Sequence, residues 1–162
     1  MNILILTILI GIGATVVMDV WTMLRKQLFG IALPNYSLVG RWVAYMPKGK
    51  FRHESIAKVP SIQFEALIGW LTHFLTGIAF AGLLVLIGGS QWIAHPTVSE
   101  PILVGIITVL APFLLMQPAM GAGIAASKTP NPRSARTQSL ITHTVFGVGL
   151  YLSGYLLSLI SA

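Results

Sequence analysis

Residues 62–87 read IQFEALIGWLTHFLTGIAFAGLLVLI, and this stretch decides the fold class of the chain. About 20 apolar residues in a helix span a hydrocarbon core of about 30 Å, and this segment is long enough to do so. Stretches at 2–24, 102–126 and 138–160 have a similar length and composition. Only 9% of the 162 residues are charged, against about 25% in an ordinary soluble domain. The sequence therefore predicts an all-α, polytopic membrane protein in which four transmembrane helices form a single domain over residues 1–162.

The basic residues predict how this domain is oriented. All ten Lys and Arg residues lie in the connections at 25–60 and 127–137. By the positive-inside rule both connections are cytoplasmic and both termini lie outside. The net charge of +6 then reflects topology and contact with anionic lipid, and no nucleic-acid partner is expected. Because the chain has no cysteine, disulfides, thiolate metal sites and cysteine nucleophiles are excluded.

The first connection is too long for a simple turn. Its apolar residues recur on one helical face after a capping Asn35, which predicts a short helix in the inner membrane interface; these residues are Leu38, Val39, Trp42, Val43 and Met46. A basic run follows, in which Lys48, Lys50 and Arg52 are expected to face anionic lipid headgroups and His53 to be solvated. His95, in the outer connection, is expected at the surface.

Two segments within the spans match each other. Leu71-Thr72-His73-x-x-x-Gly77 corresponds to Ile141-Thr142-His143-x-x-x-Gly147, and Ile8–Ile12 corresponds to Ile102–Ile106. This pattern predicts a parallel 2+2 repeat about an axis along the membrane normal. The alternative is chance, because apolar strings match easily.

Polar side chains inside the spans form the candidate ligand-binding site. An ionisable group is costly in lipid and is by default a functional hypothesis. Counting 1.5 Å per helical residue from the basic ends places the candidates in the inner half of the membrane. They are His73, His143, Asp19, Glu65 and Gln117, with Arg136 below them. The structural alternatives are hydrogen bonds within the bundle, pairing of Asp19 with a loop arginine such as Arg41, and contact of Arg136 with lipid.

Three classes of function fit these residues. His73 and His143 could hold haem iron, or a first-row divalent metal with Asp19 or Glu65 as a third ligand. A small oligomeric carrier could move protons between histidine and carboxylate, using the helix that Pro112 and Pro118 interrupt. A scaffold subunit would instead bind a partner membrane subunit. Enzymatic catalysis has the least support, because no nucleophile has an evident base beside it.

Several motifs also resemble a known family. They are Met18-Asp19-x-Trp21, Gly40-Arg41-Trp42, Gly69-Trp70-x-x-His73, Met116-Gln117-Pro118 and Ser139-Leu140-x-x-His143-x-x-Phe146-Gly147-x-Gly149-Leu150-Tyr151. This order resembles the bacterial inner-membrane family called domain of unknown function 2938, over nearly the whole chain. The resemblance implies a four-helix bacterial membrane protein and assigns no activity, substrate or site residue.

Overall fold

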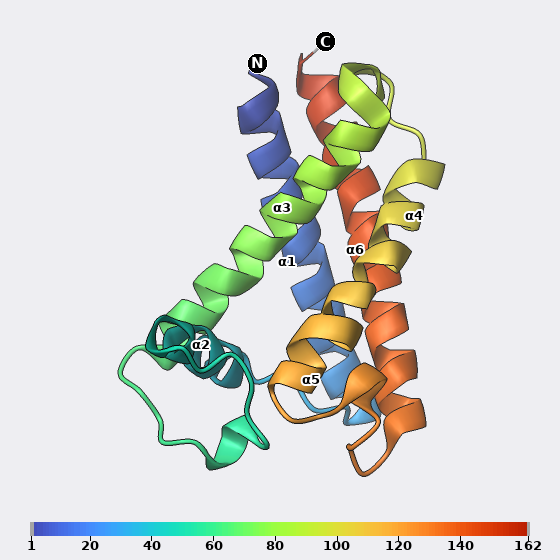
Figure 1. The fold of residues 1–162 in the computed structure, drawn as a ribbon. Helices are drawn as coiled ribbons and strands as arrows, with labels where there is room; N and C mark the ends of the chain where they lie inside the picture. Colours follow the sequence, from blue (N-terminus) through green and yellow to red (C-terminus); the bar gives the residue numbers. More distant parts are fainter. Residues whose placement is uncertain (1, 162) are drawn as a thin grey trace. The chain divides into compact units, whose positions relative to one another are not determined.

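Helices make up the fold of this chain, in a computed structural model that describes residues 2–161 (Figure 1). No strand occurs in that range. The long helices are α1 (Ile3–Phe29), α3 (Glu65–Ala94), α4 (Ser99–Thr108) and α6 (Pro132–Ser161). A π-helical segment, η3 (Pro112–Met116), and α5 (Gln117–Ala119) continue α4, so that four helical segments are long and apolar enough to cross a membrane. The predicted fold class is confirmed.

The chain folds into two compact units that alternate along the sequence. Unit 1 comprises Met1–Leu33, Phe74–Thr108 and Leu140–Ala162, and unit 2 comprises Pro34–His73 and Val109–Ser139. The shorter elements belong to unit 2; they are α2 (Tyr36–Tyr45), η1 (Met46–Lys48), η2 (Ile56–Lys58), α5 and η4 (Ile124–Ala126). The prediction of a single domain stays a prediction.

Glycines set several helix ends that the apolar pattern placed differently. α1 continues past the predicted end at residue 24 to Phe29, where Gly30 adopts a left-handed φ of 66° and ends it. The third span ends at Ala119 and not at 126, since Gly121 and Gly123 turn the chain with φ of 95° and 75°. Gly89 interrupts α3 where the sequence predicted its end, with φ 65° and ψ −174°.

Polar caps begin α2 and α6. Asn35 accepts a hydrogen bond from the Ser37 backbone N–H at 3.1 Å and starts the predicted short helix α2. Asn131 accepts one from the Ser134 N–H at 3.2 Å, and Pro132 is the first residue of α6.

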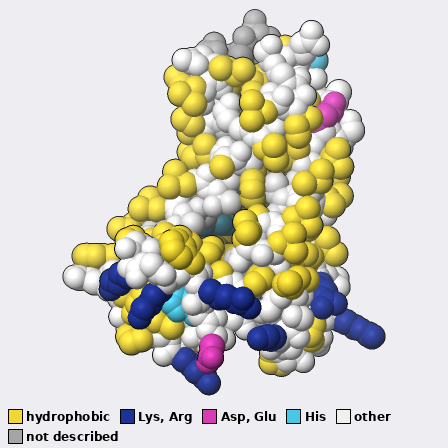
Figure 2. All heavy atoms as spheres, viewed as in Figure 1, with side chains coloured by type: hydrophobic (Ala, Val, Ile, Leu, Met, Phe, Trp, Pro, Cys, Tyr) yellow, Lys and Arg dark blue, Asp and Glu magenta, His cyan; other side chains and the backbone are white. Residues whose placement is uncertain are grey.

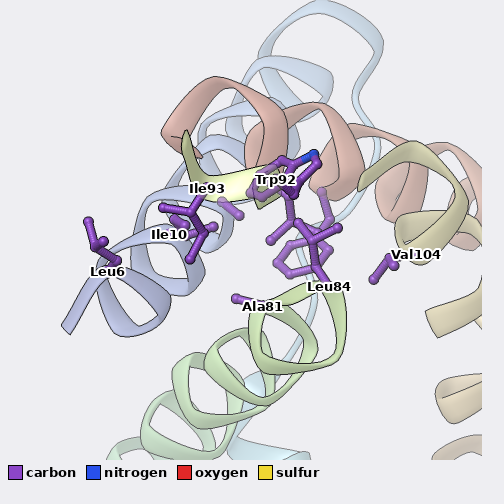
Figure 3. Close-up of a cluster of buried hydrophobic side chains, with 10 residues drawn as sticks. Leu6, Ile10, Ala81, Leu84, Trp92, Ile93 and Val104 are labelled. Carbon is purple, nitrogen blue, oxygen red and sulfur yellow. The ribbon is translucent and has the colours of Figure 1, made fainter. Parts of the chain in front are cut away.

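A cluster of apolar side chains forms the core of unit 1 (Figure 3). Ile10 of α1, Leu84 of α3 and Leu150 of α6 are fully buried there, and Trp92 is 3% exposed. The Trp92 indole N–H donates to the carbonyl of Thr97 at 3.0 Å, so its polar atom is satisfied. In water, burying one such large side chain would contribute about 1.5 to 3 kcal/mol. Within lipid the same contacts act through close packing.

Glycines let backbones touch where helices of unit 1 cross. A Cβ added to Gly11 of α1 would lie 2.5 Å from Ile78 Cα and 3.0 Å from the Gly77 carbonyl of α3. One added to Gly105 of α4 would lie 2.6 Å from the His143 carbonyl and 2.7 Å from Gly147 Cα of α6. Such separations are shorter than any side chain tolerates, so these crossings require glycine.

We expect Gly105→Ala to destabilise the protein, in contrast to Gly82→Ala. Alanine favours a helix over glycine by about 1 kcal/mol at either site. At Gly105 the new methyl would overlap the α6 backbone, and overpacking of this kind costs about 1 to 3 kcal/mol. At Gly82 the nearest atom is the Thr7 methyl at 4.0 Å. The stability of both variants is measured by thermal unfolding of the purified protein in detergent. Equal midpoints for the two variants would contradict the close backbone packing at Gly105.

Candidate functional site

The buried face of α1 carries five polar residues in addition to its apolar core residues. Thr7, Thr15, Asp19, Thr22 and Arg25 are all between 0% and 9% exposed, although they lie within an apolar span. The exposed face of the same helix carries isoleucine, leucine and valine, as a lipid-facing surface would. The threonine hydroxyls donate to carbonyls of their own helix, which leaves the charged groups as the costly members of this face.

The packing of α1 against α6 relates Asp19 to His143. A Cβ on Gly149 would lie 2.9 Å from Ala14 Cα, and one on Gly13 would lie 2.4 Å from the Ser153 hydroxyl oxygen. The two helices are therefore antiparallel at this crossing. Asp19 is five residues from Ala14 and His143 six from Gly149, in the same direction, so at 1.5 Å per residue both lie about 8 to 9 Å from the crossing. The register therefore brings this carboxylate and this imidazole to the same level of unit 1.

Thr108 orients the His143 ring. Its hydroxyl donates to the Gly105 carbonyl at 2.7 Å and also lies 3.1 Å from His143 Nδ1. A hydroxyl has one proton, so the oxygen accepts the second hydrogen bond from Nδ1–H. In the neutral imidazole the lone pair is then on Nε2, as in histidines that bind metals.

His73 lies in unit 2 with aromatic neighbours. Its Nε2 is 3.1 Å from the Tyr36 hydroxyl, and the Tyr36 ring stacks on it at 4.3 Å between centroids. Trp70 meets the same ring edge-on at 5.8 Å. A Cβ on Gly69 would overlap the Tyr36 carbonyl, so glycine permits α2 to cross this end of α3.

Glu65 is held by Arg41. The guanidinium donates two hydrogen bonds of 2.8 Å to the two carboxylate oxygens, and two further bonds to the carbonyls of Ile56 and Val59. Hydrogen bonding to Glu65 raises the pKa of Arg41 above its ordinary value. Arg41 thus fastens α2 to η2 and to the start of α3, and it does not use Asp19, the partner that the sequence had suggested.

The other predicted residues lie in unit 2 as well. Arg136 donates to the Ala125 carbonyl at 2.8 Å. Gln117 keeps its Oε1 buried, with no hydrogen-bond partner in the part of the chain that the structure describes. Lys48 and Lys50 lie over the Tyr45 ring, 4.9 and 5.9 Å from its centroid.

Arg52 lines a cavity together with His53, whose expected solvation is wrong. The His53 ring meets Tyr45 edge-on, and its Nε2 is buried without a hydrogen-bond partner. His95 is exposed, as expected. The predicted cluster is therefore divided: Asp19 and His143 belong to unit 1, and the other four candidates belong to unit 2.

Sequence reasoning missed three contributors. Thr108 gave no signal, because a threonine in a helix usually bonds its own backbone. Tyr36 follows the capping Asn35 and could have been noticed as an aromatic next to the histidine span. Lys128 was recognised only as a topological charge, although it lines the same cavity as Arg52. Over the described residues, no group of three or more His, Asp or Glu side chains could hold a metal ion.

These helices define the chain as an integral membrane protein with four candidate spanning helices. A model of the family described as protein of unknown function, DUF2938, matches residues 8–157. The chain belongs to this family, as its motifs suggested. No curated protein and no solved structure matches it.

We expect Arg41→Lys to lower the midpoint of thermal unfolding by several degrees. Lysine keeps the charge but cannot make the two parallel bonds to Glu65 while also reaching two carbonyls. Arg133→Lys, at an exposed position, is the matched control and should leave the midpoint unchanged. If both variants unfold at the wild-type temperature in detergent, the paired hydrogen bonds from Arg41 to Glu65 have no stabilising role.

Proposed function

We propose that this chain binds a first-row divalent metal ion inside the bacterial inner membrane, at the level of Asp19 and His143. The observation that carries the proposal is that these two residues lie at the same level of unit 1. The hydrogen bond from His143 Nδ1–H to Thr108 also leaves the Nε2 lone pair of His143 available to a metal ion. Carboxylate oxygen and imidazole nitrogen are donors that first-row divalent ions accept. Two protein ligands leave the remaining coordination positions to water.

The proposal includes an orientation in the membrane. Unit 2 holds eight of the ten Lys and Arg residues, namely Arg41, Lys48, Lys50, Arg52, Lys58, Lys128, Arg133 and Arg136. Figure 2 shows Lys and Arg side chains gathered over the connecting segments and apolar side chains over the long helices. The positive-inside rule then makes the connections cytoplasmic and places both termini outside.

The helix crossings support a duplicated architecture as part of this proposal. Gly11 contacts Gly77, and Gly105 contacts Gly147. These are the positions that the two pairs of matching sequence segments equate, so the same crossing occurs once in each half. Unrelated apolar strings would not have to meet at equivalent glycines.

Carriage of the ion is a second candidate function, and the irregular third span favours it. Pro112 begins a π-helical segment, and such bulges often occur at functional sites. Proteoliposomes with the wild-type protein are expected to take up Mn²⁺, and Asp19→Asn should abolish this uptake. Uptake that Asp19→Asn leaves unchanged would exclude a carrier that works through Asp19.

We expect Zn²⁺ or Mn²⁺ to raise the thermal midpoint of the detergent-purified protein, because a ligand that binds the native state stabilises it. Asp19→Asn and His143→Gln should each remove the shift. Thr108→Val should weaken metal affinity about tenfold, since it removes the acceptor that orients the ring. Thr144→Val, on the same helix as His143, is the control and should bind like the wild type.

Two outcomes would contradict the metal proposal. The first is the absence of any shift with either ion in the wild type. The second is a haem Soret band that both His73→Gln and His143→Gln remove, which would replace the metal ion by haem as the bound group.

A further inference from the structure

Unit 2 contains a cavity of about 580 Å³ between its two basic connections. Arg52, His53 and Glu54 line it from the first connection, and Gly121 and Lys128 line it from the second. Its volume is in the range of small-molecule sites. The cavity belongs to a different unit from Asp19 and His143, and it is independent of the proposed metal site.

Backbone hydrogen bonds hold the two connections together at this cavity. The His53 N–H donates to the Ala119 carbonyl at 2.8 Å, and the Ile56 N–H donates to the Met120 carbonyl at 3.0 Å. Gly121 has φ of 95°, and a Cβ there would lie 2.0 Å from the Glu54 carbonyl oxygen. The two connections can therefore touch at this wall of the cavity only because residue 121 is a glycine.

The His53 side chain leaves a polar atom buried at this wall. Its Nε2 is buried and has no hydrogen-bond partner among the described residues. This nitrogen has no surface open to the cavity, and the His53 ring, packed edge-on against Tyr45, contributes to the wall and not to ligand binding.

The charges at the cavity favour an anion. Arg52 and Lys128 bring two cations, which are 76 positions apart in sequence, to one cavity, while Glu54 contributes one carboxylate. Arg and Lys are the usual side chains that bind phosphate, Arg through paired hydrogen bonds and Lys as a point charge. Glu54 weakens this attraction without cancelling it.

We propose that this cavity binds a phosphate group, with Arg52 and Lys128 as its charged ligands. The phosphate belongs either to an anionic lipid headgroup or to a soluble phosphorylated compound. Both sources present the same oxygens to the cavity. The position of the two basic connections at the membrane surface makes either source accessible.

The test compares two double variants that remove the same charge. Full-length protein in phosphatidylcholine nanodiscs is titrated with inorganic phosphate by calorimetry, and retention of phosphatidic acid is measured by native mass spectrometry. Arg52→Gln with Lys128→Gln should lower phosphate affinity, or phosphatidic acid retention, by about tenfold or more. Lys48→Gln with Lys50→Gln, outside the cavity lining, should change either by less than about threefold. Physiological salt screens charges beyond about 8 Å and keeps the comparison local.

Two single substitutions should change the binding affinity in opposite directions. Glu54→Gln should increase affinity, because it removes a negative charge from the cavity. Gly121→Ala should reduce binding without altering any charge, whereas Gly49→Ala, at a left-handed glycine with nothing within 4 Å of its Cβ, should not. Thermal midpoints of all variants establish that they are folded.

The two probes distinguish the sources. Phosphate binding that the cavity variants weaken identifies a soluble phosphorylated ligand, and loss of phosphatidic acid retention identifies a lipid headgroup. Equal effects of the two double variants would mean that binding depends on overall charge and not on the cavity, and this would overturn the proposal. So would the absence of binding of either probe to the wild type.

Discussion

Close backbone contact at glycine is the constraint on which this structure depends. Helices in lipid gain nothing from apolar transfer when they associate, so packing and hydrogen bonds must hold them. Gly11 meets Gly77 and Gly105 meets Gly147 in unit 1, and Gly40 meets Gly69 in unit 2. The contact at Gly105 brings the α6 backbone near enough for Thr108 to bond His143. The contact at Gly40 places its neighbour Arg41 against Glu65.

The two units present opposite chemistry. Unit 1 buries a carboxylate at the level of an imidazole whose Nε2 is free to accept, a combination suited to a cation. Unit 2 surrounds a cavity with a guanidinium, an ammonium and one carboxylate, so that positive charge exceeds negative charge there, as an anion requires. The two proposals therefore concern two ligands of opposite charge. The metal proposal and the phosphate proposal rest on different residues and fail independently.

Much of the fold could be predicted because it depends on length, periodicity and local caps. Four spans follow from apolar length, and α2 and α6 begin at Asn35 and Asn131 because those side chains accept from nearby N–H groups. Helix ends at Phe29 and Ala119 were missed, since a positive φ at a glycine decides them and the apolar pattern continues past it. The site was predicted only in part. Depth along a helix predicts that Asp19 and His143 lie at one level, but depth does not state which face each side chain occupies.

By itself the sequence determined a four-span membrane protein, its two basic connections and the costly polar residues within its spans. These properties come from hydrocarbon thickness and from charge, which act on each segment separately. Only the tertiary structure decided that Glu65 belongs to Arg41, that Thr108 sets the His143 tautomer, and that Arg52 and Lys128 share a cavity. The physical reason is that each of these contacts joins segments 24 to 76 residues apart. Such pairs form only where helix crossings and left-handed glycines bring two backbones together.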